Sequence, residues 1–194
     1  MKRAEGKVIQ LQQPANAILT LDVGLANCGY AVLKNDEVVA CGVIRTKRSL
    51  KKTVRVADDS ASRAASMARE LRDIIINYKI RAIVGELPSG GARSARAMGQ
   101  MSAATAIVAS VASILDIPTE YCTPTDCKLA ACGFRSASKD DVMLAIRERF
   151  NEELFPDSKA QFEHIADALA AYLALRYDGS VIKLLIHGIV RRTT

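Results

Sequence analysis

The sequence predicts an α/β fold built on a mixed sheet of five strands flanked by helices. Short apolar runs of strand length alternate with longer stretches in which apolar residues recur every three or four positions. The first three runs follow one another closely, which predicts an antiparallel meander. Each of the last two follows a helical stretch, which predicts crossover connections. The 194 residues suffice for one domain with small additions.

Five short apolar runs are the predicted strands. The segment Lys-Asn-Asp-Glu at 34–37 is typical of a turn and separates the second run from the third. The first and fourth runs both end in an acidic residue, Asp22 and Glu86 respectively. The five predicted strands cover 17–22, 30–33, 38–44, 82–86 and 118–122.

Five helices are predicted, mainly from apolar residues spaced by three and four. Thr123 is suited to cap the start of the third helix. The stretch 97–115 carries no charge, but it is rich in Ala and Ser where a membrane span would be rich in Leu, Ile and Phe. We therefore expect a buried helix there and no membrane association. The predicted helices cover 58–78, 93–115, 123–131, 138–150 and 162–177.

The charge balance indicates an anionic partner. There are 27 Lys and Arg against 21 Asp and Glu, a net charge of +6, which favours nucleic acid or a membrane surface. Aromatic residues make up only 5%, so contacts with phosphates are expected more than stacking on bases. The segment 45–55 holds six basic residues and no acid, and it is either a solvated loop or a surface that contacts phosphates.

The cysteines and the N-terminus indicate the compartment. The five cysteines form no Cys-x-x-Cys pair, so we expect reduced thiols in a cytoplasmic protein, with a metal or redox role left open. Residues 1–16 are polar, lack the apolar core of a signal peptide and are predicted to be a flexible leader. The cysteines are Cys28, Cys41, Cys122, Cys127 and Cys132.

A cluster of acidic residues predicts a metal site. A charge at the end of a buried strand is costly unless something neutralises it, and a divalent cation would do so for Asp22 and Glu86. The last helix adds His164 and Asp167, which are three residues apart and share a helix face. Oxygen-rich ligands favour Mg²⁺ or Mn²⁺, and two such ions could hydrolyse a phosphodiester. Alternatively, each acid could simply cap a turn or helix.

Six segments, in order and with matching gaps, resemble the RuvC family of Holliday-junction resolvases. They begin with Asp-x-Gly at 22–24 and Gly-Tyr at 29–30, and they include Glu86. They end with His-Ile-Ala-Asp-Ala-Leu-Ala at 164–170. The resemblance spans roughly residues 17–177; the segments between are 42–46, 94–100 and the two lysine-bearing stretches 128–133 and 136–139.

The resemblance implies an RNase H-like fold and a homodimer that cuts two opposed strands of a four-way DNA junction. It implies two Mg²⁺ ions per site, replaceable by Mn²⁺, and hydrolysis that leaves 5′-phosphates without a nucleotide cofactor. The bacterial cytoplasm, or that of a phage-infected host, is the expected location. The implied metal ligands are Asp22, Glu86, His164 and Asp167, with Lys128 and Lys139 beside the scissile phosphate. The expected DNA contacts are Arg45, Lys47, Arg48, Arg93 and Arg96.

The sequence departs from the family in two places. The loop 87–91 lacks the aromatic residue that bacterial members often carry there, which leaves broader cleavage of forks and flaps open. Residues 178–194 form an extension whose apolar segment 181–190 is unassigned. Other RNase H-like nucleases and a catalytically inactive DNA-binding module remain alternatives, whereas an actin-like ATPase would need a second phosphate loop that is absent.

Overall fold

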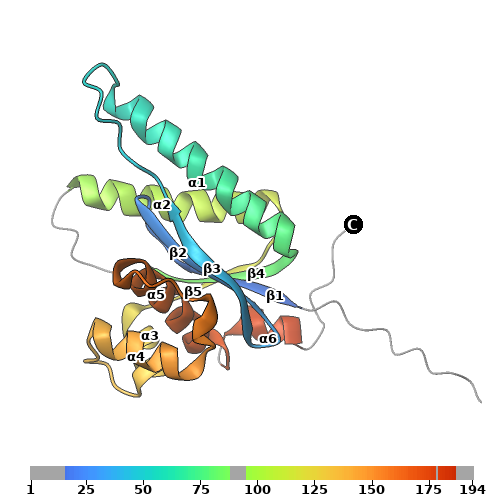
Figure 1. Ribbon diagram of the computed structural model, residues 1–194. Helices are drawn as coiled ribbons and strands as arrows, with labels where there is room; N and C mark the ends of the chain where they lie inside the picture. Colours follow the sequence, from blue (N-terminus) through green and yellow to red (C-terminus); the bar gives the residue numbers. More distant parts are fainter. Residues whose placement is uncertain (1–15, 88–94, 178, 187–194) are drawn as a thin grey trace, which may run out of the picture.

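Five strands form one mixed sheet, in the order β3-β2-β1-β4-β5, in the computed structural model (Figure 1). β1 (Ala17–Asp22), β2 (Asn27–Lys34) and β3 (Glu37–Arg45) are antiparallel neighbours, whereas β4 (Ile80–Glu86) and β5 (Thr119–Cys122) run parallel to β1. The structure describes residues 16–87, 95–177 and 179–186. The predicted meander with crossover connections is confirmed.

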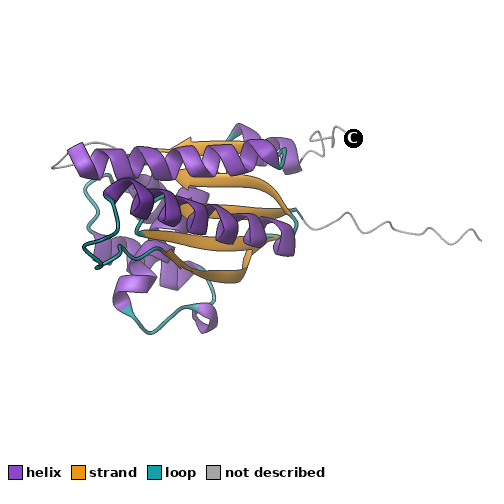
Figure 2. Cartoon of the chain, turned by 90° about the horizontal axis from the view of Figure 1, so that it is seen from above, coloured by secondary structure: helices purple, strands orange, loops and turns teal. Residues whose placement is uncertain are grey.

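Helices cover both faces of the sheet. α1 (Val56–Tyr78) and α2 (Ala95–Ile114) pack against each other on one face, and Figure 2 shows this face from above. The helices α3 (Pro124–Cys132), α4 (Lys139–Arg149) and α5 (Lys159–Leu175) cover the other (Figure 1). A short 3-10 helix, η1 (Glu152–Leu154), and α6 (Ser180–Ile186) complete the described elements.

The alternation of β1 divides the core into two clusters. Leu19 and Leu21 belong to the cluster under α1 and α2, whereas Ile18 belongs to the cluster around α5. Successive side chains of a strand point to opposite faces of the sheet, so β1 is apolar on both of its faces. A strand that is apolar on both faces must lie in the middle of the sheet, covered on each side. The hydroxyl of Thr20 is also buried and donates to the backbone carbonyl of Ala168 on α5.

The turn between β2 and β3 is fixed to the end of α5. Asn35 and Asp36 both have positive φ, 53° and 68°, as two-residue hairpin turns require. The carboxylate of Asp36 accepts from the hydroxyl of Tyr172 and pairs with Arg176. The predicted turn is therefore confirmed, and it also anchors the helix that crosses the sheet.

Gly29 allows α5 to approach the sheet closely. It pairs with Asp22 across β1 and β2, and a Cβ at this position would overlap the backbone carbonyl of His164. Only glycine lets the two backbones lie this near each other. The close approach brings His164 over the end of β1, which is where Asp22 lies.

The expectation of a buried helix at 97–115 is wrong for the single chain. Along α2 only Ala104, Val108 and Ala112 are buried, while Met98 is 58% and Ile114 is 79% exposed. A stripe of small residues suffices to pack α2 on α1 and the sheet, and the rest of the helix faces outward. Within the described part of the chain, α2 is the one helix long and apolar enough to cross a membrane.

The C-terminal segment adds a helix to the α5 side. Ile182 and Leu185 of α6 are buried in the core cluster around α5. The carboxylate of Glu120 accepts from the backbone amides of Ser180 and Val181, which fixes the start of α6. The proposed leader, apart from Asn16, and the end of the extension lie outside the described residues.

We predict that Gly29→Ala destabilises the protein by about 1–3 kcal/mol, because the added methyl group meets backbone atoms that cannot move aside cheaply. Urea denaturation of the metal-free protein measures this. The matched control is Gly99→Ala on α2, where a Cβ meets nothing within 4 Å. We expect that change to stabilise the helix by roughly 0.5–1 kcal/mol. Equal urea midpoints for both variants would contradict the close approach.

Candidate active site

Two carboxylates lie side by side at one edge of the sheet. Asp22 ends β1 and Glu86 ends β4, and the parallel register pairs the two residues directly. The carboxyl ends of parallel strands meet at the same edge, where α/β proteins place their ligand sites. Both residues are partly buried. The strand-end acids are therefore adjacent, as the sequence predicted.

Helix α5 brings two more ligand-type side chains to this edge. His164 and Asp167 lie one turn apart, and Nδ1 of His164 is 2.7 Å from Oδ2 of Asp22. All four residues line one pocket of about 410 Å³. The structure thus brings together the whole predicted ligand set from three separate elements of the chain.

The two predicted lysines line the same pocket. Each is carried by a helix whose start is fixed by a capping box. Thr123 and Asp126 cap α3 ahead of Lys128, and Ser138 and Asp141 cap α4 immediately at Lys139. In each capping box, the side chain of the residue before the helix accepts a hydrogen bond from the backbone amide of the third helical residue. The carboxylate of that third residue accepts a hydrogen bond from the backbone amide of the residue before the helix. The sequences Thr-x-x-Asp and Ser-x-x-Asp therefore encode where the two lysines lie.

The carboxylates of the pocket are partly removed from water and repel one another. Burial, together with the charges of Asp167 and Asp22, raises the pKa of Glu86 to about 7. Burial and the charge of Asp22 raise the pKa of Asp167 to about 6. Removal from water and mutual repulsion both disfavour the ionised form of an acid. The folded chain therefore holds negative charges together at an energetic cost.

Two cationic side chains offset part of this repulsion. The hydrogen bond with Asp22 raises the pKa of His164, which favours the imidazolium. Lys139 pairs with Glu163 and lies 3.9 Å from a carboxylate oxygen of Asp167. The pairing with Glu163 raises the pKa of the Lys139 ammonium. Glu163, the residue before His164, is thus engaged by a lysine.

The donor set fits a divalent cation. Three carboxylates and one imidazole suit Mg²⁺ or Mn²⁺, and raised carboxylate pKa values mark a site that gains from an added positive charge. A metal-binding histidine commonly donates its other ring N–H to a carboxylate, and the contact between Nδ1 and Asp22 leaves Nε2 available. Among the described residues, no three donors are already arranged around one point as in a filled site.

Four of the predicted DNA-contacting residues are described by the structure, and they lie outside this pocket. Arg45 ends β3 opposite Asn27, at the same end of the sheet as Asp22, and Lys47 and Arg48 follow it in an exposed loop. Arg96 is exposed in the first turn of α2, and Arg93 lies outside the described residues.

The basic loop is anchored at two points. The amide of Ser49 donates to Asp59 at 2.7 Å, and Nε of the buried Arg63 donates to the hydroxyl of Thr46 at 3.0 Å. Both anchors come from α1, so the start of the loop is fixed relative to the sheet while its charged side chains face outward.

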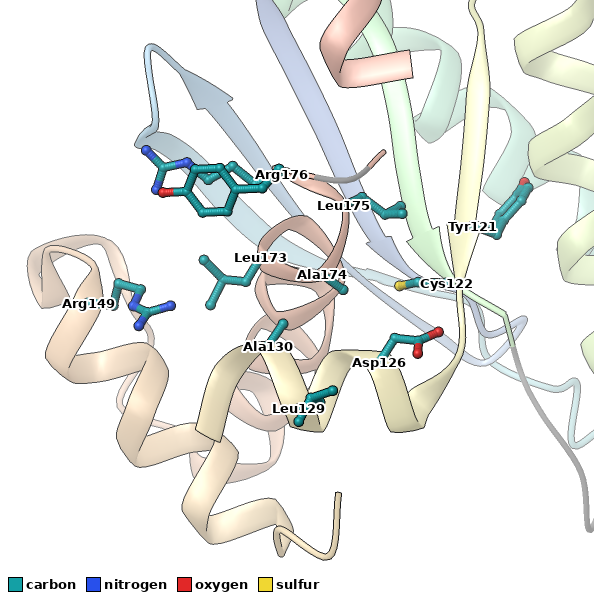
Figure 3. Close-up of a pocket in the computed structure, with 11 residues that line it drawn as sticks. Tyr121, Cys122, Asp126, Leu129, Ala130, Arg149, Leu173, Ala174, Leu175 and Arg176 are labelled. Atoms are coloured by element: carbon teal, nitrogen blue, oxygen red, sulfur yellow. The ribbon is translucent and has the colours of Figure 1, made fainter. Parts of the chain in front are cut away.

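A larger pocket of about 840 Å³ lies between α3 and the end of α5, and it shares no lining residue with the first (Figure 3). Its lining includes the apolar Leu129 and Leu173 and the cationic Arg149. The carboxylate of Asp126, which also lines it, is engaged in the cap of α3. The larger pocket lacks the acidic cluster of the smaller one. Pocket volume alone therefore does not identify the candidate site.

Cys127 is a pocket residue that the sequence did not identify. Its Sγ lies 3.4 Å from that of Cys122, and this contact together with burial raises the pKa of the thiol. A usable signal was the position of Cys127 directly before Lys128, in the first turns of a helix that follows a strand end.

Comparison with known proteins gives one consistent result. The family model for the crossover junction endodeoxyribonuclease RuvC matches residues 18–175. A RuvC protein of Natranaerobius thermophilus is 29% identical over 163 residues, covering 80% of this chain and 91% of its own length. One from a Synechococcus species is 32% identical over 165 residues, covering 80% and 95%.

Solved structures share the fold. The T. thermophilus RuvC in complex with a Holliday junction substrate superposes with a TM-score of 0.68 at 19% identity, over 84% of this chain and 93% of that one. The yeast mitochondrial Holliday junction resolvase gives a TM-score of 0.55 at 13% identity, over 83% and 78%. The predicted RNase H-like architecture is confirmed.

We predict that the metal-free protein loses stability as the pH rises from 4.5 to about 7. Because the folded-state pKa of Glu86 is raised above its unfolded value, the folded protein binds more protons in this window, and its stability falls as they leave. The raised pKa of His164 acts in the same direction. Glu86→Gln should reduce this loss by on the order of 2 kcal/mol.

Urea denaturation in EDTA at the two ends of this pH range measures the effect. The control is Glu148→Gln on the exposed side of α4, which should keep the wild-type pH dependence. If the wild-type protein became more stable with rising pH, the repulsion among the carboxylates would be disproved.

Proposed function

The chain belongs to the RuvC family of crossover junction endodeoxyribonucleases, and from this premise we propose how it resolves four-way DNA junctions. One observation carries the proposal: a single pocket unites Asp22, Glu86, His164 and Asp167 with both lysines. Acidic ligands beside cationic phosphate-binding groups are what metal-dependent cleavage of a phosphodiester requires.

The four ligand-type residues would hold two Mg²⁺ ions, with Mn²⁺ able to replace them. Mg²⁺ held by these residues would supply an activated water and a charge that stabilises the leaving 3′-oxygen, so that hydrolysis would yield a 5′-phosphate. Asp22 accepts from the ring of His164 and so fixes its orientation. No side chain is required to form a covalent bond to the DNA.

The lysines would bind the scissile phosphate. The ammonium of Lys139 is held at the pocket wall by Glu163, and Lys128 lines the pocket from α3. Positive charge placed where negative charge develops in the transition state lowers the barrier more than the same charge in water would.

DNA would bind across the catalytic edge of the sheet. Arg45, Lys47 and Arg48 extend from this end, and the chain carries a net charge of +6. We propose that Arg93 and Arg96 add contacts from the start of the central helix. Phosphate contacts of this kind set the position of a protein on DNA and do not read its sequence.

A homodimer would provide the two active sites that paired nicks require. The outward surface of α2, with Met98 58% and Ile114 79% exposed, is the surface that we assign to the second copy. Small residues along a helix allow close packing against a second helix. We assign residues 17–177 to the nuclease domain, 1–16 to a leader and 178–194 to an extension, in a protein that acts on cytoplasmic DNA.

A broader specificity is the second candidate. The loop that follows Glu86 reads Leu-Pro-Ser-Gly-Gly at 87–91 and contains no aromatic side chain to stack on a base at the junction centre. This feature favours cleavage of forks and flaps alongside four-way junctions.

We predict that the wild-type protein with Mg²⁺ cuts two opposed strands of a four-way junction symmetrically. Asp22→Asn should abolish cutting while leaving junction binding intact, because it removes a ligand charge and keeps the shape of the side chain. Matched junction, Y-fork, linear duplex and RNA–DNA hybrid substrates measure the preference. Equal cutting of forks and junctions would support the second candidate, and cutting of the hybrid alone would refute both.

We predict that Lys47→Ala/Arg48→Ala lowers the slope of log affinity against log salt by about 1.8, which is about 0.9 for each phosphate that the variant no longer neutralises. The control is Lys34→Ala/Lys79→Asn at the opposite end of the sheet, beside Ala17. Asparagine suits residue 79, whose φ is 56°. Fluorescence anisotropy of a labelled junction gives both slopes. Identical slopes for the two double variants would exclude the basic loop as a DNA-binding surface.

A further inference from the structure

Thr46 joins the basic loop to the loop that follows Asp22. The backbone amide of Thr46 donates to the carbonyl of Ala26 at 3.0 Å, and its hydroxyl donates to the carbonyl of Leu25. The side chain of Leu25 is buried in the core cluster under α1 and α2, and Thr46 is buried as well. One buried residue therefore connects the segment that we assign to phosphate binding with the chain that leaves the acidic pocket.

Arg63 of α1 completes the hydrogen bonding of this threonine. Its Nε donates to the hydroxyl of Thr46 at 3.0 Å. A hydroxyl donates one proton and also accepts, so the bond to Leu25 and the bond from Arg63 together fix its direction. The hydroxyl is thus held between α1 and the loop that follows Asp22.

The buried stripe of α1 is charged only in its first turns, where it faces the basic loop. Asp59 accepts from the amide of Ser49 at 2.7 Å, and four residues later Arg63 donates to Thr46. Burying a charged group is costly unless it is well hydrogen-bonded, so these two contacts account for the charged residues. The apolar members of the same stripe are Met67, Leu71 and Ile75.

We propose that Arg63 is a positioning residue for junction cleavage. Through the hydroxyl of Thr46 it holds the loop that follows Asp22 and the basic loop in one fixed relation. DNA bound along the basic loop then presents its scissile phosphate to the acidic pocket. Arg63 is buried and does not line that pocket, so it acts through Thr46. The inference rests on the proposed functions of the pocket and of the basic loop.

The expected effect is on the rate of cutting and not on the strength of binding. Cleavage requires the phosphate and the pocket residues in a defined geometry, and a displacement of about 1 Å caused far from the chemistry can cost about a hundredfold in rate. Affinity depends on phosphate contacts, which Lys47 and Arg48 would still make. Loss of the bond from Arg63 should therefore slow the cutting of bound DNA.

The test compares two uncharged replacements of equal length. Arg63→Gln places an amide N–H as many bonds from the backbone as Nε, whereas Arg63→Met places a methyl group there. Single-turnover cutting of a four-way junction with Mg²⁺ and saturating protein gives the rate of the bound complex. We expect Arg63→Met to cut about tenfold to a hundredfold more slowly than wild type and Arg63→Gln to cut within about threefold of it.

Thr46→Val tests the other side of the same contact. It removes the hydroxyl, and it should slow cutting at least as much as Arg63→Met does. The double variant Thr46→Val/Arg63→Met should be no slower than Thr46→Val, because both changes remove one shared hydrogen bond. Slowing that multiplies in the double variant would overturn the proposal.

Ile75→Val is the control for a loss of stability. It deletes a buried methyl group from the same stripe of α1, lowers the melting temperature and should leave the rate of cutting unchanged at 25 °C. Thermal unfolding of all variants shows how far each is destabilised. A rate that fell in Ile75→Val as in Arg63→Met would show an effect of helix stability and overturn the positioning role.

Anisotropy of a labelled junction in EDTA separates positioning from direct DNA contact. Both Arg63 variants should keep the wild-type slope of log affinity against log salt. A slope lowered by about 0.9 in both would show that Arg63 neutralises a phosphate itself, and it would overturn the positioning role. Equal slowing of cutting in Arg63→Gln and Arg63→Met would likewise overturn it, since the charge and not the donor would then matter.

The wild-type protein distinguishes this inference from the proposed function. A wild-type protein that cuts junctions, together with an Arg63→Met variant that cuts equally fast, would overturn the role of Arg63 alone. A wild-type protein that cuts no junction would overturn the proposed function and, with it, the inference. Slow cutting by Arg63→Met with rescue in Arg63→Gln would support the inference.

Discussion

The parallel pairing of β1 with β4 is the constraint on which the rest of the site depends. It places Asp22 directly beside Glu86, and the geometry of the sheet then fixes two acidic side chains at one edge. Like charges held at close range in a partly buried pocket are unfavourable, as the raised pKa of Glu86 shows. The two core clusters on either side of β1 provide the stability that maintains this arrangement.

Much of this arrangement can be predicted from the sequence because it is encoded locally. Strand-end acids follow apolar runs, and the capping residues Thr123 and Ser138 mark where α3 and α4 begin. The contacts that could not be predicted depend on spatial register. Nothing in the sequence places Cys127 in the same pocket as Glu86, since 41 positions separate them and only the pairing of β4 with β5 brings them together. The exposure of α2 was missed because composition reports how apolar a helix is, not how much of it is covered.

The three carboxylates of the pocket are not compensated equally. Asp22 lies beside the imidazole of His164 and Asp167 beside the ammonium of Lys139, whereas burial and the charges of Asp167 and Asp22 raise the pKa of Glu86. A third fixed cation against Glu86 would neutralise the pocket and lower its affinity for a metal ion. Without the two cations, the carboxylates would repel one another more strongly. The packing of α5 against Gly29, where the two backbones lie too close to shift, would then have to oppose this repulsion. Partial compensation keeps net negative charge in the pocket.

The partners of Lys139 would connect this compensation to the phosphate binding that we propose for it. Its ammonium pairs with Glu163, and the same group lies 3.9 Å from Asp167. A divalent cation among the carboxylates would reduce the attraction of Asp167 for Lys139, while Glu163 would still hold the ammonium at the pocket wall. The released positive charge would then be directed at an incoming phosphate. Glu163 would thereby hold Lys139 at the pocket wall in both conditions, a role other than that of a metal ligand.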